Sequence, residues 1–191
     1  QRDQARTLGY TVVDAATAIS THLNKVLREN ASDLLSHDET QQLLDKLAAK
    51  SPKIVEDLVP GKLSLGILTR TLQNLLQESV SIRDMRTIAE ALTEASTRTQ
   101  DPEQLTAMVR PKLGRMIMQS LIDGDNGLQV MTLEPSLEQL LHNVLQQSQP
   151  GQAVVMEPGL SENLFAGLRE GARTVEDMGH PAVLVVSPVI R

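Results

Sequence analysis

The sequence of 191 residues contains no cysteine, no tryptophan, one tyrosine and one phenylalanine. Without cysteine the chain has no disulfide framework, no thiolate nucleophile and no cysteine-ligated zinc or iron–sulfur site. The two aromatic residues, Tyr10 and Phe165, are too few to form a platform on which the bases of a single-stranded nucleic acid could stack. The composition therefore excludes cysteine chemistry and argues against single-strand binding.

The chain also lacks a basic surplus and a long apolar run. Its 18 Lys and Arg residues are outnumbered by 24 Asp and Glu residues, which gives a formal net charge of −6. Duplex binding requires cations that neutralise phosphates, so we expect no nucleic-acid partner. The longest apolar run, around residues 181–186, is far shorter than the roughly twenty residues of a membrane span. The sequence begins with neither Met nor a signal-peptide pattern, and we expect it to be a piece of a longer protein.

The middle of the chain is rich in helix signals. Ser36 and Glu39 have the spacing of a capping box, in which each residue satisfies a free backbone or side-chain group of the other. Leucines in the range 68–76 recur at i, i+4, i+7 and i+8, which is one face of a helix buried on one side. These patterns predict an all-helical domain over residues 36–121.

Further helix boundaries are predicted from capping and proline signals in the same region. Ser51 precedes Pro52, so the serine hydroxyl is expected to cap a short helix. Ser81 is expected to start another helix, and Asp101 a third. Pro111 lies inside the helix that begins at Asp101, where the missing N–H should kink it.

The first 35 residues predict a strand followed by a helix. Residues 9–13 are a short apolar stretch, and Asp14 is placed to cap a helix that runs to about residue 30. One strand cannot form a sheet alone, so residues 1–35 are interpreted as a fragment of an α/β or α+β unit whose other strands are missing from the sequence.

The last 70 residues predict a small α/β unit. Two apolar stretches, residues 128–133 and residues 182–186, are typical of strands, and two helices lie between them. We interpret residues 122–191 as an incomplete C-terminal domain. The expected fold class is α+β and mainly helical, with this unit following the helical domain.

No motif assembles a catalytic or metal site, and we expect no cofactor. The four histidines lie on different predicted elements without metal-ligand spacing. Asp123, Asp125 and Glu134 match positions 1, 3 and 12 of a calcium loop, but Leu128 occupies the position that requires glycine. An enzyme with a scattered active site, using Glu134, His142 or Glu157, stays open as an alternative. Perturbed carboxylates converging in one deep pocket would favour it.

One charged cluster has two interpretations. Arg83, Asp84 and Arg86 surround a predicted helix start, where they can form a solvated face or a local ion network. Exposed ion pairs contribute little to stability, so in a self-assembling protein the same cluster could instead contact a second copy. Both interpretations stay open at this point.

Seven segments of the sequence resemble the FlhA family of export-gate proteins of type III secretion. The resemblance covers nearly the whole chain in one order and is carried by GYTVVDAATAISTHL (9–23), QQLLDKLAAKSPKIVEDLVPG (41–61), LQNLLQESVSIRDMRTIAEAL (72–92), DPEQLTAMVRPKLGR (101–115), VMTLEPSLEQLL (130–141), MEPGL (156–160) and PAVLVVSPVIR (181–191). The stretches VEDLVPG and IRDMRTI look more like the flagellar branch. The homologous export gate of a virulence injectisome is the alternative within the family.

The resemblance implies a non-enzymatic docking platform. It identifies the chain as part of the cytoplasmic domain of a multi-pass membrane protein, at the cytoplasmic face of the bacterial inner membrane. Residues 1–35 would close a ferredoxin-like subdomain, and the helical and α/β parts would be the third and fourth subdomains. Such domains form a homo-oligomeric ring. Their partners are flagellar export chaperones with their substrates, the ATPase complex and the switch protein of the export gate.

The resemblance also implies a chaperone-binding site near the start of the chain. Thr21, in the stretch STHL, matches the threonine of an ATHL motif in the family. Val13 and Ala18 match the neighbouring apolar wall. The family site is completed by an Asp and an aromatic residue of an upstream DPAF-like stretch, which this sequence does not contain.

Overall fold

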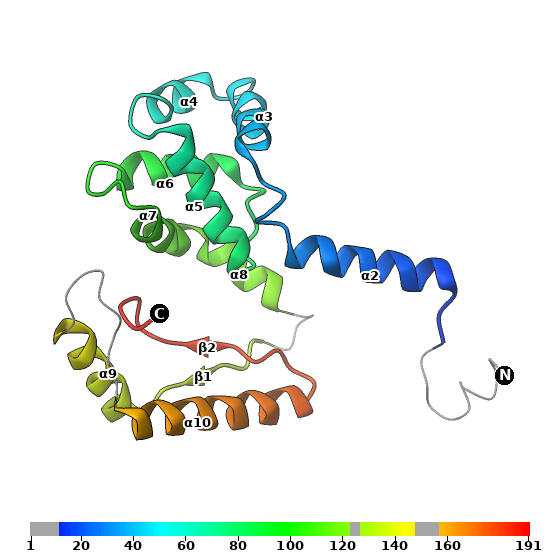
Figure 1. The fold of residues 1–191 in the computed structure, drawn as a ribbon, viewed down its shortest axis with the longest axis vertical. Helices are drawn as coiled ribbons and strands as arrows, with labels where there is room; N and C mark the ends of the chain where they lie inside the picture. The colour runs from blue at the N-terminus through cyan, green and yellow to red at the C-terminus, as the bar shows by residue number, and fades with distance from the viewer. Residues whose placement is uncertain (1–11, 123–126, 148–156) are drawn as a thin grey trace. The chain divides into compact units, whose positions relative to one another are not determined.

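Helices dominate the computed structural model, which describes residues 12–122, 127–147 and 157–191 (Figure 1). In chain order the elements are α2 (Ala15–Glu29), α3 (His37–Ala48), α4 (Pro52–Leu58), α5 (Leu65–Gln77), α6 (Met85–Ala95), α7 (Pro102–Val109), the 3-10 helix η1 (Arg110–Leu113), α8 (Gly114–Leu121), β1 (Met131–Thr132), α9 (Pro135–Gln147), α10 (Pro158–Asp177) and β2 (Leu184–Val185). This mainly helical architecture with one two-stranded sheet confirms the coarse fold class predicted from the sequence.

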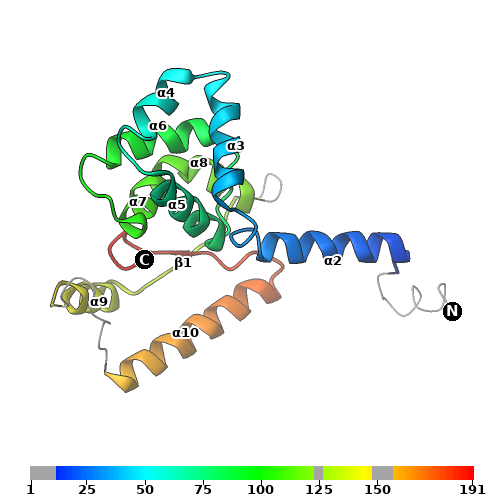
Figure 2. The ribbon, with the colours of Figure 1, turned by 45° about the horizontal axis from the view of Figure 1, so that its top comes forward.

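The chain divides into two compact units, Gln1–Ile117 and Met118–Arg191, so the division falls within α8. The first unit contains α2 and a helical bundle built from α3 to η1, which Figure 2 shows from a second direction. The second unit contains the two strands with α9 and α10. None of the described helices is long and apolar enough to span a bilayer.

Helix α2 begins where its cap residue predicts. The Asp14 carboxylate accepts a hydrogen bond from the Thr17 N–H at 2.7 Å. This bond to the backbone stabilises the charged form and lowers the pKa of Asp14. No residue of α2 is buried, and Ile19 on its apolar stripe is 68% exposed. Leu23, one turn further along, is 54% exposed, whereas Leu27 near the helix end lines a hollow together with residues of the bundle.

The helical bundle has a leucine-rich core. Leu68, Leu72 and Leu75 lie on one face of α5 and are completely buried. Ile88 and Leu92 of α6 pack in the same cluster and are equally inaccessible. The spacing that predicted a buried helix face in residues 68–76 is thus confirmed, because residues at i, i+4 and i+7 point in the same direction along a helix.

Two buried threonines join α3 to α5 inside this core. The Thr69 hydroxyl donates to the Thr40 hydroxyl oxygen at 3.1 Å. The Thr40 hydroxyl also bonds the Ser36 carbonyl at 2.9 Å, one turn earlier in α3. Both hydroxyls are therefore satisfied without water, which removes the desolvation cost that an unpaired buried polar group would carry.

The start of α3 is a capping box, as Ser36 and Glu39 predict. The Ser36 hydroxyl oxygen accepts from the backbone at the helix start, and the Ser36 N–H donates to the Glu39 carboxylate at 3.0 Å. The Ser36 hydroxyl also donates to the same carboxylate. The hydroxyl bond first, and the backbone bond second, hold the pKa of Glu39 below its usual range.

We expect the capping box to weaken in acid. A carboxyl with a lowered folded-state pKa stabilises the fold above its ordinary pKa of 4.5, and this contribution is lost as the pH falls through the lowered value. Glu39→Gln keeps a hydrogen-bond acceptor but removes the charge. The difference in urea midpoint between the natural chain and Glu39→Gln should therefore shrink from pH 7 to pH 3. A difference that stays constant over this range would contradict the assignment, and Ser36→Ala, which removes the hydroxyl partner, should flatten the same dependence.

Helix α5 ends in a Schellman motif that has serine in the left-handed position. Ser79 has φ +58°, and it is the only non-glycine residue with positive φ among those described. The Val80 N–H bonds the Leu75 carbonyl at 2.8 Å, and the Ser79 N–H bonds the Leu76 carbonyl at 2.9 Å. The end of α10 has the same pattern with Gly179 at φ +82°. The motif normally uses glycine because a Cβ atom strains this conformation.

Ser79→Gly is expected to stabilise the helical bundle by about 0.5 kcal/mol. Relief of the left-handed strain is worth about 1 kcal/mol, and the greater freedom of glycine in the unfolded chain removes roughly half of that gain. Ser79→Ala serves as the control, since alanine keeps the Cβ and should give no gain. Denaturant midpoints of the three proteins test this, and an equal gain from alanine would show that strain at φ is not the cause.

Pro111 interrupts the long helix predicted from Asp101, which confirms the expected kink. Helix α7 ends at Val109, the segment Arg110–Leu113 forms a 3-10 turn, and α8 starts at Gly114. Proline cannot donate the backbone bond that a continuous α-helix requires at this point. The Arg110 guanidinium forms an ion pair with the Glu78 carboxylate at the end of α5.

The second unit is a parallel strand pair connected through two helices. Met131 pairs with Leu184, and Thr132 pairs with Val185. Parallel strands need a long crossover connection, and α9 and α10 lie within it. The Ser187 N–H donates to the Glu138 carboxylate at 3.0 Å, which links the chain after β2 to α9. Both strands are shorter than predicted, because in the described part of the chain each finds a ladder partner over two residues.

Two predicted capping roles are wrong in detail. Ser51 occupies the N-cap position of α4, but its hydroxyl makes no capping bond there. Ser81 does not start α6: its hydroxyl oxygen accepts from the Arg83 N–H at 3.3 Å in a local turn. Asp84 is the N-cap instead. Serine forms such short turns as readily as it caps helices, so spacing alone did not separate the two roles.

Some sequence predictions lie wholly or partly outside the described residues. The predicted strand at 9–13 and the loop at 146–152 fall in this group, as do Asp123 and Asp125 of the calcium-like turn.

Candidate protein-docking surfaces

The predicted chaperone-binding residues lie on or next to α2. Ala18 and Thr21 are in the helix, and Val13 precedes its cap. All three are exposed. At about 3.6 residues per turn, Thr21 lies on the opposite side of α2 from Ile19 and Leu23. The helix therefore has an apolar stripe on one side and an accessible polar side that includes Thr21.

The predicted charged cluster lines a hollow of about 540 Å³ between α3 and the start of α6. We call it the basic hollow. Its charged side chains come from two elements: Arg83, Asp84 and Arg86 at the start of α6, and two lysines of the α3 end. The other residues that line the hollow come from α3, from the two residues after its end, and from α6: Leu43, Lys46, Leu47, Ala49, Lys50 and Met85.

Two members of the cluster also have local roles. Both carboxylate oxygens of Asp84 accept hydrogen bonds from Thr87, one from its N–H at 3.1 Å and one from its hydroxyl at 2.7 Å. The Arg86 Nε lies 3.0 Å from the Glu90 carboxylate, one turn along α6. Helix capping therefore accounts for Asp84, and exposed pairs such as Arg86 with Glu90 add only about 0.3–0.5 kcal/mol. Arg83 has no comparable role in stabilising α6.

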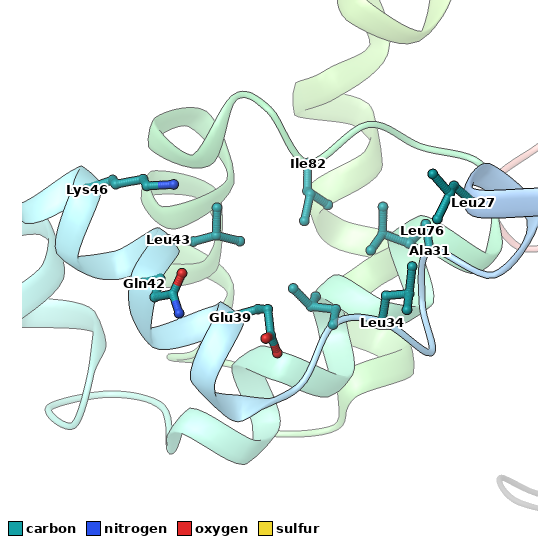
Figure 3. A pocket seen from close by; sticks show the side chains of 10 residues that line it. Leu27, Ala31, Leu34, Glu39, Gln42, Leu43, Lys46, Leu76 and Ile82 are labelled. Atoms are coloured by element: carbon teal, nitrogen blue, oxygen red, sulfur yellow. The ribbon is translucent and has the colours of Figure 1, made fainter. Parts of the chain in front are cut away.

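A second hollow, the apolar groove, lies beside the basic hollow. It has a volume of about 370 Å³. In Figure 3 the side chains of Leu43, Leu76 and Ile82 point toward the space between them. Its other lining residues are Leu27, Ala31, Leu34, Leu35, Glu39, Gln42 and Lys46. The Glu39 carboxylate at its edge is already engaged by the capping box, so the groove offers mainly apolar contact area.

The two hollows share Leu43 and Lys46 of α3. Sequence reasoning selected the α6 half of the basic hollow and missed Lys46 and Lys50. Both lysines are exposed; Lys46 lies in the last turn of α3, and Lys50 lies two residues after the helix. Their i, i+4 spacing in the sequence could have suggested that they share one face. Their proximity to Arg83 and Arg86 depends on how α3 packs against α6, which no local pattern records.

In the described part of the chain, the side chains suggested for a scattered active site do not come together. Neither hollow contains Glu134, His142 or Glu157. The ring of His142 instead shares a hydrogen bond with the Gln146 amide at 2.7 Å. The two carboxyls with a displaced pKa, Asp14 and Glu39, are both lowered by helix-capping bonds. No group of three or more metal-ligating side chains occurs in residues 12–122, 127–147 and 157–191.

Comparison of the sequence with known proteins gives matches over the whole chain. The FHIPEP family matches residues 1–191. The flagellar biosynthesis protein FlhA of Yersinia enterocolitica is 46% identical over 190 residues, and that of Escherichia coli is 45% identical. The FlhA of Bacillus subtilis is 34% identical. The chain is covered completely in each case but spans only 27% to 28% of the length of these relatives.

Comparison of the fold gives solved structures of similar architecture. A complex of the Chlamydia pneumoniae proteins CdsV and CdsO matches with a TM-score of 0.77 at 21% identity, over 100% of this chain and 56% of that chain. The nonameric EPEC SctV-C matches with a TM-score of 0.73 at 27% identity, over 91% of this chain and 59% of that chain. The Shigella flexneri MxiA protein matches with a TM-score of 0.74 at 24% identity, over 88% and 52%. The matches below 25% identity establish the shared fold.

Proposed function

The chain belongs to the FHIPEP family, and from this premise we propose that it is part of a docking platform in a flagellar type III export gate. The match over all 191 residues is the observation that carries the proposal. Two exposed candidate surfaces, the polar side of α2 and the basic hollow, support it. The platform binds partner proteins and performs no catalysis.

The flagellar branch is favoured over the injectisome branch by sequence identity. Relatives named as the flagellar protein FlhA are 34% to 46% identical to the chain over its whole length. The chain spans about a quarter of these relatives, so the remainder of such a protein would supply the other parts of the gate. We propose that this remainder includes the membrane helices, which would place the chain at the cytoplasmic face of the inner membrane. Residues 1–35 would then close a ferredoxin-like subdomain.

The polar side of α2 is the proposed docking site for export chaperones carrying their substrates. In this arrangement the apolar stripe with Ile19 and Leu23 packs against the upstream subdomain. The opposite side, with Ala18 and Thr21, then stays accessible. Val13 would complete the apolar wall next to them. The exposure of all three side chains supports this division of α2 into a packed side and a binding side.

A charge placed at Thr21 tests the chaperone site. Thr21→Asp in the full-length protein should weaken binding of chaperone–substrate complexes at least tenfold, because burial of an unpaired carboxylate against an apolar partner surface is costly. Thr97→Asp makes the same chemical change at an exposed threonine beyond α6 and should leave binding unchanged. Binding is measured by pull-down and by titration of purified complexes. Equal affinities of Thr21→Asp and the natural protein would remove Thr21 from the site.

Homo-oligomeric ring assembly is the second part of the proposal. One solved structure of the same fold is described as nonameric, and another is a complex with a second protein, CdsO. We propose that this protein likewise forms a ring and that Arg83, Asp84 and Arg86 contact the neighbouring copy. Partners from the export apparatus, namely the ATPase complex and the switch protein, would dock on the assembled ring.

A further inference from the structure

The basic hollow has an unbalanced charge. It is lined by four cations, Lys46, Lys50, Arg83 and Arg86, and by one anion, Asp84. The Asp84 carboxylate already accepts two hydrogen bonds from Thr87. Of these four cations, only Arg86 has a carboxylate of a described residue within 4.0 Å. Three cations therefore face solvent around a single concave surface.

The floor of the basic hollow is apolar. Leu47 and Met85 are buried beneath it, and Leu43 contributes a half-buried side. A fully solvated charged face needs no such floor, whereas protein interfaces combine apolar contact area with arginine at the margin. The hollow is therefore suited to a protruding partner segment that carries carboxylates.

The same helical bundle carries a protrusion of opposite charge at the end of α4. Glu56 and Asp57 are adjacent and exposed in the last turn of this helix. Carboxylates at a helix C-terminus face the negative end of the helix dipole, and α4 has no basic residue in its last turn. Neither carboxylate has a Lys or Arg partner within 4.0 Å in the described part of the chain. Their position is unfavourable with respect to the helix dipole.

The backbone after α4 turns back onto the end of the helix. The N–H groups of Lys62 and Leu63 both bond the Leu58 carbonyl, at 3.0 and 2.8 Å. Gly61 lies so close to the helix end that a Cβ atom would sit 2.9 Å from the Asp57 carbonyl oxygen. These contacts define where the helix ends, and the side chains of Glu56 and Asp57 beside this end are exposed. We call Glu56 and Asp57 the acidic tip.

Neither residue of the acidic tip lines the basic hollow of its own copy. In Figures 1 and 2 the chain leaves α4 on the side away from α3, while the hollow lies between α3 and the start of α6. The tip therefore does not fill the hollow of its own copy. Two complementary surfaces at separate places on one subunit are what a head-to-tail contact requires, and such a contact forms a ring when its rotation closes and an open filament when it does not.

We propose that the basic hollow receives the acidic tip of a second copy of this chain. Glu56 and Asp57 of one copy then lie against Lys50, Arg83 and the neighbouring cations of the next. This inference rests on the ring assembly proposed above and names the surface that meets Arg83, Asp84 and Arg86. Charge-assisted hydrogen bonds between guanidinium and carboxylate groups supply both attraction and register.

Charge reversal of each surface in the full-length protein tests the pairing. Lys50→Glu with Arg83→Glu makes the hollow acidic, and Glu56→Lys with Asp57→Lys makes the tip basic. Either double variant alone should weaken self-association at least tenfold, measured by cross-linking and by imaging of rings. All four changes in one chain should restore association, and so should mixing the two double variants, because unlike surfaces then meet again. Arg70→Glu with Arg98→Glu, an equal reversal at exposed arginines, should have no effect.

The outcomes distinguish a failure of this pairing from a failure of the ring assembly proposed above. Rings that survive both double variants would overturn the pairing and leave the ring itself standing. A full-length protein that does not self-associate at all would overturn both. Loss of association in the double variants without rescue in the fourfold variant or the mixture would also overturn the pairing. Loss of another export component's binding, with self-association intact, would assign the hollow to that partner instead.

Discussion

Leu72→Ala is expected to lower the free energy of unfolding of the helical bundle by about 3 kcal/mol. Leu72 is completely buried in the middle of α5, among leucines and an isoleucine from α5 and α6. Removal of three carbon atoms there loses their transfer free energy and leaves a cavity that the surrounding helices fill only in part. Loss of this size is a large fraction of the total stability of a small unit.

The control for this prediction is Leu34→Ala. Leu34 is 58% exposed, so the same truncation should change the free energy of unfolding by no more than about 0.5 kcal/mol. Urea unfolding followed by far-ultraviolet circular dichroism measures both variants. Similar losses for the two leucines would mean that the α5 face does not form the core described here.

Gly171→Leu is expected to destabilise the α/β unit, whereas Gly167→Leu in the same helix should stabilise it. A Cβ atom at Gly171 would lie 3.1 Å from the Met131 sulfur of β1, and nothing lies within 4 Å of a Cβ atom at Gly167. Overpacking costs about 1–3 kcal/mol, while replacing glycine in an open helix position gains nearly 1 kcal/mol. The two variants should therefore differ by about 2 kcal/mol.

The pair isolates packing from helix propensity, because both changes are identical and lie one turn apart in α10. Thermal unfolding of the α/β unit measures the difference. Gly171→Ala should be nearly neutral, since the Met131 side chain can move a few tenths of an ångström. Equal stabilisation by leucine at both positions would show that α10 does not pack on β1 at Gly171.

Helix positions in the bundle were predictable because the signals are local. The capping box at Ser36 and the proline at 111 each act within one or two turns of their own position. Ser51 and Ser81 were predicted with the same reasoning and misassigned in part, because a serine hydroxyl can serve a turn as well as a cap. Strand lengths were less predictable, since a strand ends where its ladder partner ends.

The residues of the candidate surfaces were likewise only partly predictable from the sequence. Thr21 and Arg83 were selected from the sequence, by family resemblance and by charge clustering. Whether they act in binding and assembly stays a prediction. The sequence could not associate Lys50 with Arg83, because 33 positions of chain separate two side chains that line one hollow only through the packing of α3 beside α6. The separation of the acidic tip from that hollow depends on the same packing.

The sequence by itself determined the cysteine-free, acidic composition, the mainly helical class, the capping box at Ser36 and the family, because composition, periodicity and motif order are properties of the linear chain. Only the tertiary structure decided that Ile19 and Leu23 of α2 are exposed in the described chain and that α3 and α6 enclose a basic hollow. It also places the acidic tip of α4 outside that hollow. Burial and the convergence of charges depend on contacts between residues far apart in sequence, and a single sequence does not specify these contacts locally.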